Sequence, residues 1–515
     1  MPYVVTQSCC ADAACVLACP VNCIHPAPGE PGFAEAEMLY VDPQACVDCG
    51  ACVTACPVGA IKPHTKLSEA ELPFLQLNAD YFAAEPHADR TPLAKVPPKQ
   101  AVTSPLRVAV VGAGPAGLYA ADELLKHTGV TVDVFDRLPT PYGLVRAGVA
   151  PDHPTTKQVT ELFRAIEKER GFSYVLGVEV GKDITQADLA QRYGAVVYTV
   201  GAATDRTLGL QGEELPGSAS ATQFVAWYNG HPDHTDAPVD LQTERVVVIG
   251  TGNVALDVAR ILTTDPTRLA NTDIADHALV ALQASRVREV VLLGRRSPAD
   301  AAFTMPELIG LAGRPDIDVV VEGELEVVDA KTALLAELAA RPKDPSRRRI
   351  VLRFHTTPVR VVGDDRVAGL EVGGGEVIET GVVLRAVGYR GVPVLDLPFD
   401  ETTGTVPHDR GRVAPGVYVA GWIKRGPNGF IGTNKTCAEE TVEQLLDDHE
   451  AGLLTTPMLR DLPPHIDRRG WRAIDRVERM TGAAEGRPRV KITDRDELAN
   501  VARTARRARS RRRVS

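Results

Sequence analysis

The segment from Leu106 to Asp136 constrains the fold of this chain more than any other part of the sequence. An apolar stretch leads into Gly112-Ala-Gly114-Pro-Ala-Gly117, a helix-forming stretch follows, and a second apolar run ends on Asp136. This order predicts strand, glycine turn, helix and strand, with the helix N-terminus facing a phosphate. Asp136 lies at the distance from the glycines where an acid accepts hydrogen bonds from a ribose hydroxyl. The segment therefore predicts a dinucleotide site.

A second glycine loop, at residues 245–262, repeats the pattern of strand, turn and helix around Gly250-Thr-Gly252. The strand expected to pair with it, residues 290–294, ends on Arg295 and Arg296 instead of an acid. Two guanidinium groups suit a 2'-phosphate, so we expect this site to bind NADP rather than NAD. The alternative is a pair of surface arginines at a strand end.

The cysteines form a third signal, because nine of the ten fall between Cys9 and Cys56. Such clustering indicates a local metal site and not a disulfide framework. The run Cys46-x2-Cys49-x2-Cys52-x3-Cys56-Pro has the spacing of bacterial ferredoxins, in which three thiolates hold one iron-sulfur cluster and the fourth reaches another. A zinc site fits this close-set triplet poorly.

The upstream run Cys15-x3-Cys19-Pro supplies the partner half of the cysteine pattern. By the same crossing rule, Cys19 completes one 4Fe-4S cluster, and the other cluster uses Cys56, Cys15 and either Cys9 or Cys10. No cysteine stands midway between Cys9 and Cys15, so the second cluster is expected to be 3Fe-4S, with 4Fe-4S left open. The metal ligands expected are Cys9, Cys15, Cys19, Cys46, Cys49, Cys52 and Cys56.

Length and composition limit the remaining possibilities. A chain of 515 residues with a net charge of -10 is expected to form about three domains. No apolar run reaches membrane-spanning length and the start lacks a signal-peptide pattern, so we expect a cytoplasmic protein without membrane insertion. The end, Arg503 to Ser515, carries seven arginines and no acid, which predicts a solvated, disordered arm. The sequence does not predict an oligomeric state.

Together these patterns predict an α/β chain with two nested Rossmann-like dinucleotide-binding domains, preceded by a small α+β ferredoxin-like iron-sulfur domain. We expect the iron-sulfur domain at residues 1–84, a first dinucleotide-binding domain at 106–206 and 376–515, and an NADP-binding domain at 207–375. Residues near Arg385 and 416–421 are expected to be strands that return to the first sheet. The proline-rich residues 85–105 are either a semi-rigid linker or an ordered strap over a neighbouring domain.

Two family resemblances add to this interpretation. The cysteine-rich start resembles the seven-iron ferredoxins, which pair a 3Fe-4S with a 4Fe-4S cluster, and the likeness extends to Phe74-Leu-Gln-Leu-Asn78. That resemblance implies that Cys23 is a free thiol beside the 4Fe-4S cluster. From Arg107 nearly to the C-terminus the chain resembles adrenodoxin reductase-type ferredoxin-NADP reductases, through the loop at 137–154, Gly252-Asn-Val-Ala-Leu-Asp257 and Gly421-Trp-Ile-Lys-Arg-Gly-Pro-Asn-Gly429.

The motifs and the second resemblance give the expected cofactor contacts. For FAD these are Gly112, Gly114, Ala116, Gly117, Asp136, Leu144, Val180, Trp422, Gly429, Phe430 and Ile431. For NADP they are Gly252, Asn253, Val254, Ala255, Arg295, Arg296 and Glu307. The candidates for tuning the flavin or positioning the nicotinamide are Asp152, His153 and Asp240.

Electron counting gives the expected function. NADPH gives two electrons as a hydride and an iron-sulfur cluster accepts one at a time, whereas a flavin can do both. We therefore expect a FAD-dependent ferredoxin-NADP reductase with a built-in ferredoxin, whose Cys19, Cys46, Cys49 and Cys52 cluster accepts electrons from the flavin. The expected partners are NADPH and an external ferredoxin or another one-electron acceptor, and no nucleic acid is expected. Two alternatives remain open: the electron-input subunit of a glutamate synthase, and an iron-sulfur redox sensor that uses its basic end to bind a partner.

Overall fold

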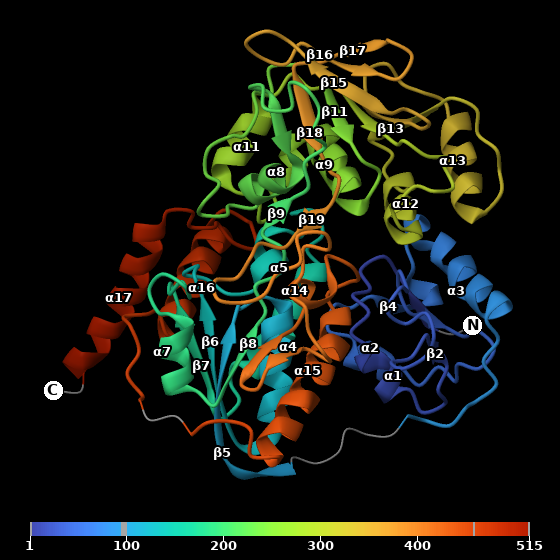
Figure 1. Cartoon of the computed structure of the whole chain (residues 1–515). Helices are drawn as coiled ribbons and strands as arrows, with labels where there is room; N and C mark the ends of the chain where they lie inside the picture. Colours follow the sequence, from blue (N-terminus) through green and yellow to red (C-terminus); the bar gives the residue numbers. More distant parts are fainter. Residues whose placement is uncertain (1–2, 94–99, 457–458, 513–515) are drawn as a thin grey trace.

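The computed structural model describes residues 3–93, 100–456 and 459–512, with side chains described as far as Thr504. Figure 1 shows three parts. A cysteine-rich lobe (residues 3–93) lies at one side. A first lobe (residues 100–203 and 391–512) lies beside it, and a second lobe (residues 206–388) lies above both.

The cysteine-rich lobe is built from short elements around two antiparallel strand pairs, β1–β4 and β2–β3. Its strands are β1 (Tyr3–Val5), β2 (Ile24–His25), β3 (Tyr40–Val41) and β4 (Ile61–Pro63). Its helices are α1 (Ala14–Ala18), α2 (Ala51–Ala55), α3 (Pro73–Ala84) and the 3-10 turns η1 (His64–Lys66) and η2 (Glu69–Glu71). The buried Asn78 of α3 ties the lobe together, because it accepts from the Val5 and Val41 N–H groups and donates to the Val5 and Phe74 carbonyls.

The first lobe contains a six-stranded sheet in which only β20 is antiparallel. Its order is β20 (Arg412–Ala414), β21 (Val417–Val419), β8 (Ala195–Tyr198), β5 (Gln100–Val111), β6 (His127–Asp136) and β7 (Phe172–Leu176). Its helices are α4 (Pro115–Leu125), α5 (Gly143–Ala147), η3 (Thr156–Gln158), α6 (Val159–Ile166), α7 (Gln186–Arg192), α14 (Trp422–Arg425), α15 (Thr433–Glu450), α16 (Arg468–Ala484) and α17 (Arg495–Arg512). The predicted strand, glycine turn, helix and strand are thus β5, α4 and β6, and α15 packs along α4.

The second lobe contains a fully parallel six-stranded sheet. Its order is β10 (Ser218–Ser220), β18 (Val382–Arg385), β11 (Arg245–Ile249), β12 (Glu289–Leu293), β14 (Arg348–Arg353) and β13 (Ile317–Glu322). Its helices are α8 (Ala221–Tyr228), α9 (Asn253–Thr263), α10 (Pro266–Leu269), α11 (Asp276–Gln283), α12 (Met305–Ala312) and α13 (Ala330–Ala340). A three-stranded antiparallel sheet, β15 (Pro358–Val362), β16 (Gly369–Val372) and β17 (Val377–Glu379), covers its outer end.

The structure corrects one predicted strand. The segment ending at Arg385 is β18, which pairs with β10 and β11 in the second sheet and does not return to the first. The chain crosses between the lobes just beyond it, where β9 (Thr204–Asp205) pairs antiparallel with β19 (Tyr389–Arg390). The second sheet therefore extends past residue 375. The predicted strand at 416–421 is confirmed, since β21 pairs with β8.

Part of the predicted linker is an ordered strap. Residues 85–93 lie against the cysteine-rich lobe: the His87 ring stacks 3.8 Å from that of His25, and Arg90 pairs with Asp42 at 2.8 Å. Residues 100–105 belong to β5, and residues 94–99 lie outside the described part of the chain. The strap therefore anchors the segment that leaves α3.

The basic C-terminal segment is helical and not disordered as far as Arg512. It continues α17, which packs on α16 through the buried Leu498 and Ala502. The packing of this helix was not predicted, because it depends on two apolar residues that precede an arginine-rich segment. Within the described ranges, the helices include none long and apolar enough to cross a membrane.

A buried ion cluster fixes the second lobe on the first. Asp273 of the second lobe accepts from Lys157 at 2.6 Å and from Lys491 at 3.1 Å, both of the first lobe. Burial alone would raise the pKa of Asp273, but the two ammonium groups hold it well below its usual range. The carboxylate therefore stabilises this lobe arrangement in its charged form.

We predict that Asp273→Asn lowers the free energy of unfolding by about 3 to 5 kcal/mol at neutral pH, because Lys491 keeps a buried charge without its partner. The folded pKa of Asp273 is depressed, so its contribution is present above the unfolded pKa of about 4 and is lost as the pH falls below it. Urea unfolding at neutral and acidic pH measures the difference. The control is Asp240→Asn: the Asp240 side chain is 57% exposed, so its replacement should leave the free energy of unfolding unchanged. An equal loss of stability in both variants would contradict the role proposed for Asp273.

Candidate nucleotide and metal sites

The first cavity, of about 440 Å³, opens above the β5–α4 turn of the first lobe. Its lining includes most of the residues expected to contact FAD, namely Gly112, Gly114, Ala116, Asp136, Leu144, Trp422, Gly429, Phe430 and Ile431. Val254 of the second lobe also reaches it. The motif thus folds into a cradle at the N-terminus of α4, where backbone N–H groups face a bound anion.

Two details of this cradle fit a dinucleotide. Gly117 packs the helix against the turn so closely that a Cβ there would lie 1.9 Å from the Gly112 carbonyl oxygen. Asp136 is held at the rim by the Ala113 and Leu138 N–H groups, one on each carboxylate oxygen, at 2.9 and 2.8 Å. Each oxygen keeps a lone pair for a ribose hydroxyl.

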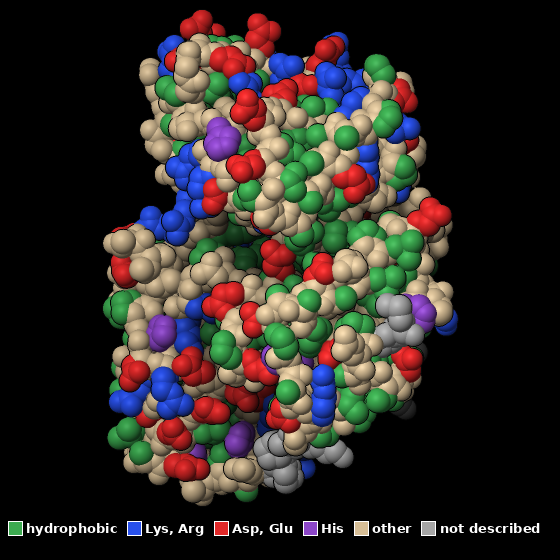
Figure 2. Space-filling model, turned by 90° about the vertical axis from the view of Figure 1, so that its right-hand side faces the viewer, with side chains coloured by type: hydrophobic (Ala, Val, Ile, Leu, Met, Phe, Trp, Pro, Cys, Tyr) green, Lys and Arg blue, Asp and Glu red, His purple; other side chains and the backbone are tan. Residues whose placement is uncertain are grey.

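The second cavity, of about 660 Å³, lies at the carboxyl end of the parallel sheet of the second lobe. Gly252, Asn253, Val254, Arg295 and Arg296 line it. Both arginine side chains are exposed, and Arg296 has only a distant acid, Asp300 at 3.8 Å. Figure 2, seen from the side of the cysteine-rich lobe, shows the hollow between the upper and lower halves of the molecule.

The two cavities share a wall. Val254, Tyr389, Trp422, Gly429 and Phe430 line both of them. The Trp422 indole donates to the Asn428 carbonyl and its ring lies 5.2 Å from that of Tyr389. Two ligands bound in these cavities would therefore meet at this wall.

Asp152 belongs to an ion network below the second glycine loop. Arg260 of α9, 4% exposed, binds it through two bonds of 2.6 and 3.0 Å. Burial would raise the pKa of Asp152, but the Arg260 guanidinium holds it well below its usual range. His153 and Arg260 approach Glu307 at 3.9 and 3.8 Å, and burial raises the pKa of Glu307.

Several residues expected at the site lie elsewhere. Asp240 is an exposed residue of the loop before β11 that accepts from the Gln242 N–H, so the structure does not bring it to either cavity. Val180 packs in a hydrophobic cluster of the first lobe, and Ala255 is fully buried in α9. Neither lines a cavity. Val180 and Ala255 therefore belong to the hydrophobic cores of their lobes and not to the cavity walls.

Four of the predicted cysteines surround one small cavity of the cysteine-rich lobe. Cys19, Cys46, Cys49 and Cys52, hereafter the outer group, line it together with Cys23. The Cys19 sulfur lies 3.4 Å from that of Cys23 and accepts the Cys23 N–H. Four convergent thiols around a space of their own fit a cubic cluster. Cys49 is exposed, so this group reaches the surface.

Cys9, Cys15 and Cys56, hereafter the inner group, form the second set. Burial, and then the charges of Cys9 and Cys56, raise the pKa of the Cys15 thiol. The Cys9 and Cys56 sulfurs accept the N–H groups of Leu39 and Ala60. The neighbouring Cys10 thiol lies close to the same group, since burial, and then the charges of Asp12, Cys9 and Cys56, raise its pKa. The three thiols and their N–H donors also fit a cluster.

The loop beside the inner group contacts the wall of the first cavity. The Cys10 carbonyl accepts the Gly432 N–H at 2.7 Å, and Gly432 directly follows Phe430 and Ile431 of the first-cavity wall. The loop from Cys9 to Asp12 therefore adjoins the wall of the first cavity. The sequence could not show this, because it depends on the docking of two lobes.

Sequence reasoning also missed Asp12. It stands three residues after Cys9 and three before Cys15, the place that Cys49 holds between Cys46 and Cys52. The residue is 6% exposed and accepts the Ala14 N–H at 3.0 Å. Its spacing was a signal that could have been found.

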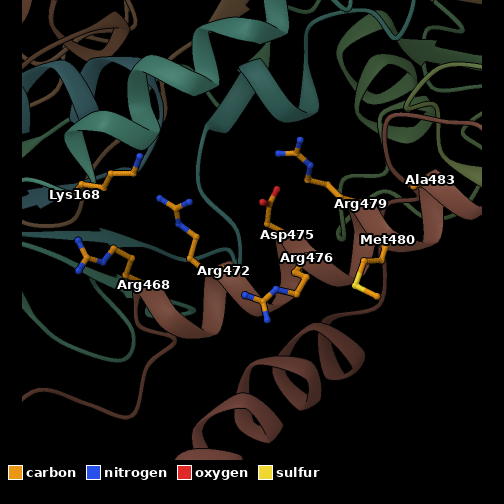
Figure 3. A pocket seen from close by; sticks show the side chains of 8 residues that line it. All are labelled: Lys168, Arg468, Arg472, Asp475, Arg476, Arg479, Met480 and Ala483. Atoms are coloured by element: carbon orange, nitrogen blue, oxygen red, sulfur yellow. The ribbon is translucent and has the colours of Figure 1, made fainter.

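A basic hollow on α16 lies apart from these sites. Figure 3 shows Arg468, Arg472, Arg476 and Arg479 along this helix, with Lys168 just past α6. Arg472 is already paired with Glu167 at 2.8 Å. Helix α16 and the cysteine-rich lobe lie on opposite sides of the molecule (Figure 1), and the residues of the hollow contribute to neither cavity.

Comparison with known proteins agrees with this organisation. Residues 106–428 match the pyridine nucleotide-disulphide oxidoreductase family, and residues 39–62 match the 4Fe-4S binding domain. A probable ferredoxin/ferredoxin--NADP reductase of Mycobacterium tuberculosis is 52% identical, covering 100% of this chain and 97% of that protein. The NADPH:adrenodoxin oxidoreductase of Arabidopsis thaliana is 40% identical over 78% of this chain and 96% of its own length. The structure of Mycobacterium tuberculosis FprA in complex with NADPH superposes with a TM-score of 0.72 at 40% identity, covering 77% of this chain and 99% of that one.

The chain therefore belongs to the pyridine nucleotide-disulphide oxidoreductase family. Within that family it is a FAD-dependent ferredoxin-NADP reductase that carries an iron-sulfur ferredoxin domain at its N-terminal side. The predicted fold class, family and enzyme class are confirmed.

Proposed function

We propose that the protein passes the two electrons of NADPH through FAD, one at a time, to its own cysteine-rich lobe and then to a separate one-electron acceptor. One observation carries the proposal: the two cavities meet at Trp422, Gly429 and Phe430, and the cysteine-rich lobe docks at Gly432. A flavin supplies the exchange between hydride and single-electron chemistry, while the protein binds, orients and separates the cofactors.

We assign the first cavity to FAD. Gly112, Gly114 and Ala116 place backbone at the N-terminus of α4, where the pyrophosphate is stabilised by N–H groups. Asp136 accepts the ribose hydroxyls through the lone pairs left by its two N–H bonds. Leu144, 38% exposed, also lines the cavity.

The second cavity is assigned to NADPH. Gly252 and Asn253 lie at the start of α9, and the Asn253 side chain accepts the Thr304 N–H at 2.9 Å, which fixes the segment before α12. Arg295 and Arg296 lie where the 2'-phosphate of NADPH is expected. Their exposure leaves both guanidinium groups available for bidentate contacts.

We propose that Asp152 acts as an anchor between lobes, because its bond to Arg260 joins the loop beside FAD to helix α9. The same network holds His153 and Glu307, which, like Asp152, line neither cavity. Asp240 has no role in this proposal.

The two cysteine groups are assigned to two clusters, the outer group to 4Fe-4S and the inner group to 3Fe-4S. Support for the latter is the set of three thiols, because Asp12 stands where a fourth cysteine would be expected, and its carboxylate accepts the Ala14 N–H. External ferredoxin or another one-electron carrier is the proposed acceptor. The cytoplasmic location stays a prediction.

We predict that replacing both Arg295 and Arg296 with Ala raises the KM for NADPH far more than that for NADH. Loss of one charge-assisted contact to the 2'-phosphate costs about 1.5 to 3 kcal/mol, or roughly 10- to 150-fold. Anaerobic reduction of a one-electron dye with each nucleotide measures this. Equal increases for both nucleotides would contradict the assignment, and absence of turnover in the unmodified protein would favour a redox sensor.

We predict that the oxidised protein shows a paramagnetic signal near the free-electron value, as an oxidised 3Fe-4S centre does. Asp12→Cys completes a fourth thiol and should remove that signal, whereas Asp12→Asn should retain it. Electron paramagnetic resonance with iron analysis makes the test. No such signal in the oxidised, fully loaded protein would contradict the inner-group assignment.

A further inference from the structure

The contact between the cysteine-rich lobe and the first lobe is a backbone contact without room for a side chain. A Cβ on Gly432 would lie 2.1 Å from the Ala11 carbonyl oxygen and 2.3 Å from the Asp12 nitrogen. Together with the bond from the Gly432 N–H to the Cys10 carbonyl, this places residues 10–12 directly on the start of α15. Only glycine at 432 allows this approach.

The contact is part of a packed interior. Cys10, Cys15 and Val16 belong to the same hydrophobic core as Leu118 and Tyr119 of α4. A second anchor holds the lobe from above, where Glu37 accepts the Met305 N–H at 2.7 Å and Gln7 donates to Glu307 at 3.0 Å. The cysteine-rich lobe therefore has one fixed position against the wall of the flavin cavity.

Two short helices connect the inner and outer groups. Helix α1 carries Cys15 of the inner group and is followed by Cys19 of the outer group, while α2 carries Cys52 of the outer group and is followed by Cys56 of the inner group. In each case the two ligands are four positions apart in the sequence, which corresponds to a helical rise of about 6 Å. The two groups are therefore neighbours in a line.

The far end of that line reaches the surface. Cys49 is exposed, and so are the two residues before it, Val47 and Asp48; Val47 is 58% exposed. The inner group has no comparable exposure, since Cys15 is buried and Cys9 and Cys56 are half-buried. An external protein can approach the outer group closely but not the inner group.

We propose that the two cysteine groups work in series in a fixed direction, with the inner group receiving electrons from the flavin and the outer group delivering them at the face around Val47, Asp48 and Cys49. Gly432 is the positioning residue that sets the first transfer. This inference rests on the proposed function and specifies its route. Each NADPH gives up a hydride, which carries two electrons and one proton. The electrons leave the flavin cavity one at a time through the inner and then the outer group and reduce two one-electron acceptors, and the proton is released.

The test uses the full, cofactor-loaded protein, mixed anaerobically with NADPH and frozen at successive times. The resonance signal that Asp12→Cys alters identifies the inner group. In the unmodified protein that group should be reduced before the outer group. In Gly432→Ala the flavin should be reduced at an unchanged rate, while reduction of both groups slows by about tenfold or more, because a displacement near 1 Å is costly.

Controls separate position from folding. Gly373→Ala introduces the same methyl group where the nearest atom is 3.9 Å away, and should change nothing. If Gly432→Ala does not fold, a second variant, Lys435→Glu, takes its place. It exchanges the cation near Asp12 for an anion and should slow electron transfer from the flavin to the inner group. Resonance spectra of both the oxidised and the chemically reduced variants, together with an iron content equal to that of the unmodified protein, show that both groups are still loaded.

The surface around Val47, Asp48 and Cys49, where electrons are proposed to leave the protein, is tested with basic mitochondrial cytochrome c as the acceptor. Val47→Lys should slow its reduction by roughly three- to tenfold through charge repulsion, without changing the internal steps, while Val280→Lys on the exposed face of α11 should not. Reduction of the outer group first, or unchanged transfer in both Gly432→Ala and Lys435→Glu, would overturn the series order. Equal effects of Val47→Lys and Val280→Lys would overturn the exit face. Failure of NADPH to reduce the flavin at all would instead overturn the proposed function.

Discussion

The close approach of residues 10–12 to Gly432 determines how the rest of the structure can work. The bond from Gly432 to Cys10 is one of many backbone hydrogen bonds, but it joins the loop that carries the inner cysteines to the segment that forms the wall of the flavin cavity. The buried core continues across this boundary. The cysteine-rich lobe is consequently a built-in component of the reductase and not a tethered neighbour.

The second lobe is held by charges instead of apolar packing alone. Asp273 with its two lysines, and Asp152 with Arg260, each join the first lobe to the second. Buried ion pairs contribute little net stability compared with apolar contacts, but they select one geometry, because a displaced partner leaves an uncompensated charge. The wall shared by the two cavities depends on that geometry.

The sequence predicted the local structures well. The glycine loops, the helix after each of them and both cysteine groups follow from spacing, because each depends on residues close together in the chain. What failed depended on contacts between distant segments. Arg385 ends a strand of the second sheet, and Asp240 lies on the surface. The contact between the loop of the inner group and the wall of the flavin cavity depends on the docking of two lobes, which cysteine spacing does not encode. The strap at residues 85–93 and the packing of α17 likewise arise from tertiary contacts that no local pattern encodes.

Electron transfer within one molecule, which the docking of the cysteine-rich lobe requires, is tested most directly by the dependence of that transfer on protein concentration. After anaerobic stopped-flow mixing with excess NADPH, the rate constant for bleaching of the iron-sulfur absorbance should be the same across a hundredfold range of protein concentration, since donor and acceptor lie in one folded unit. A rate constant that rises in proportion to protein concentration would show transfer between molecules and contradict the account.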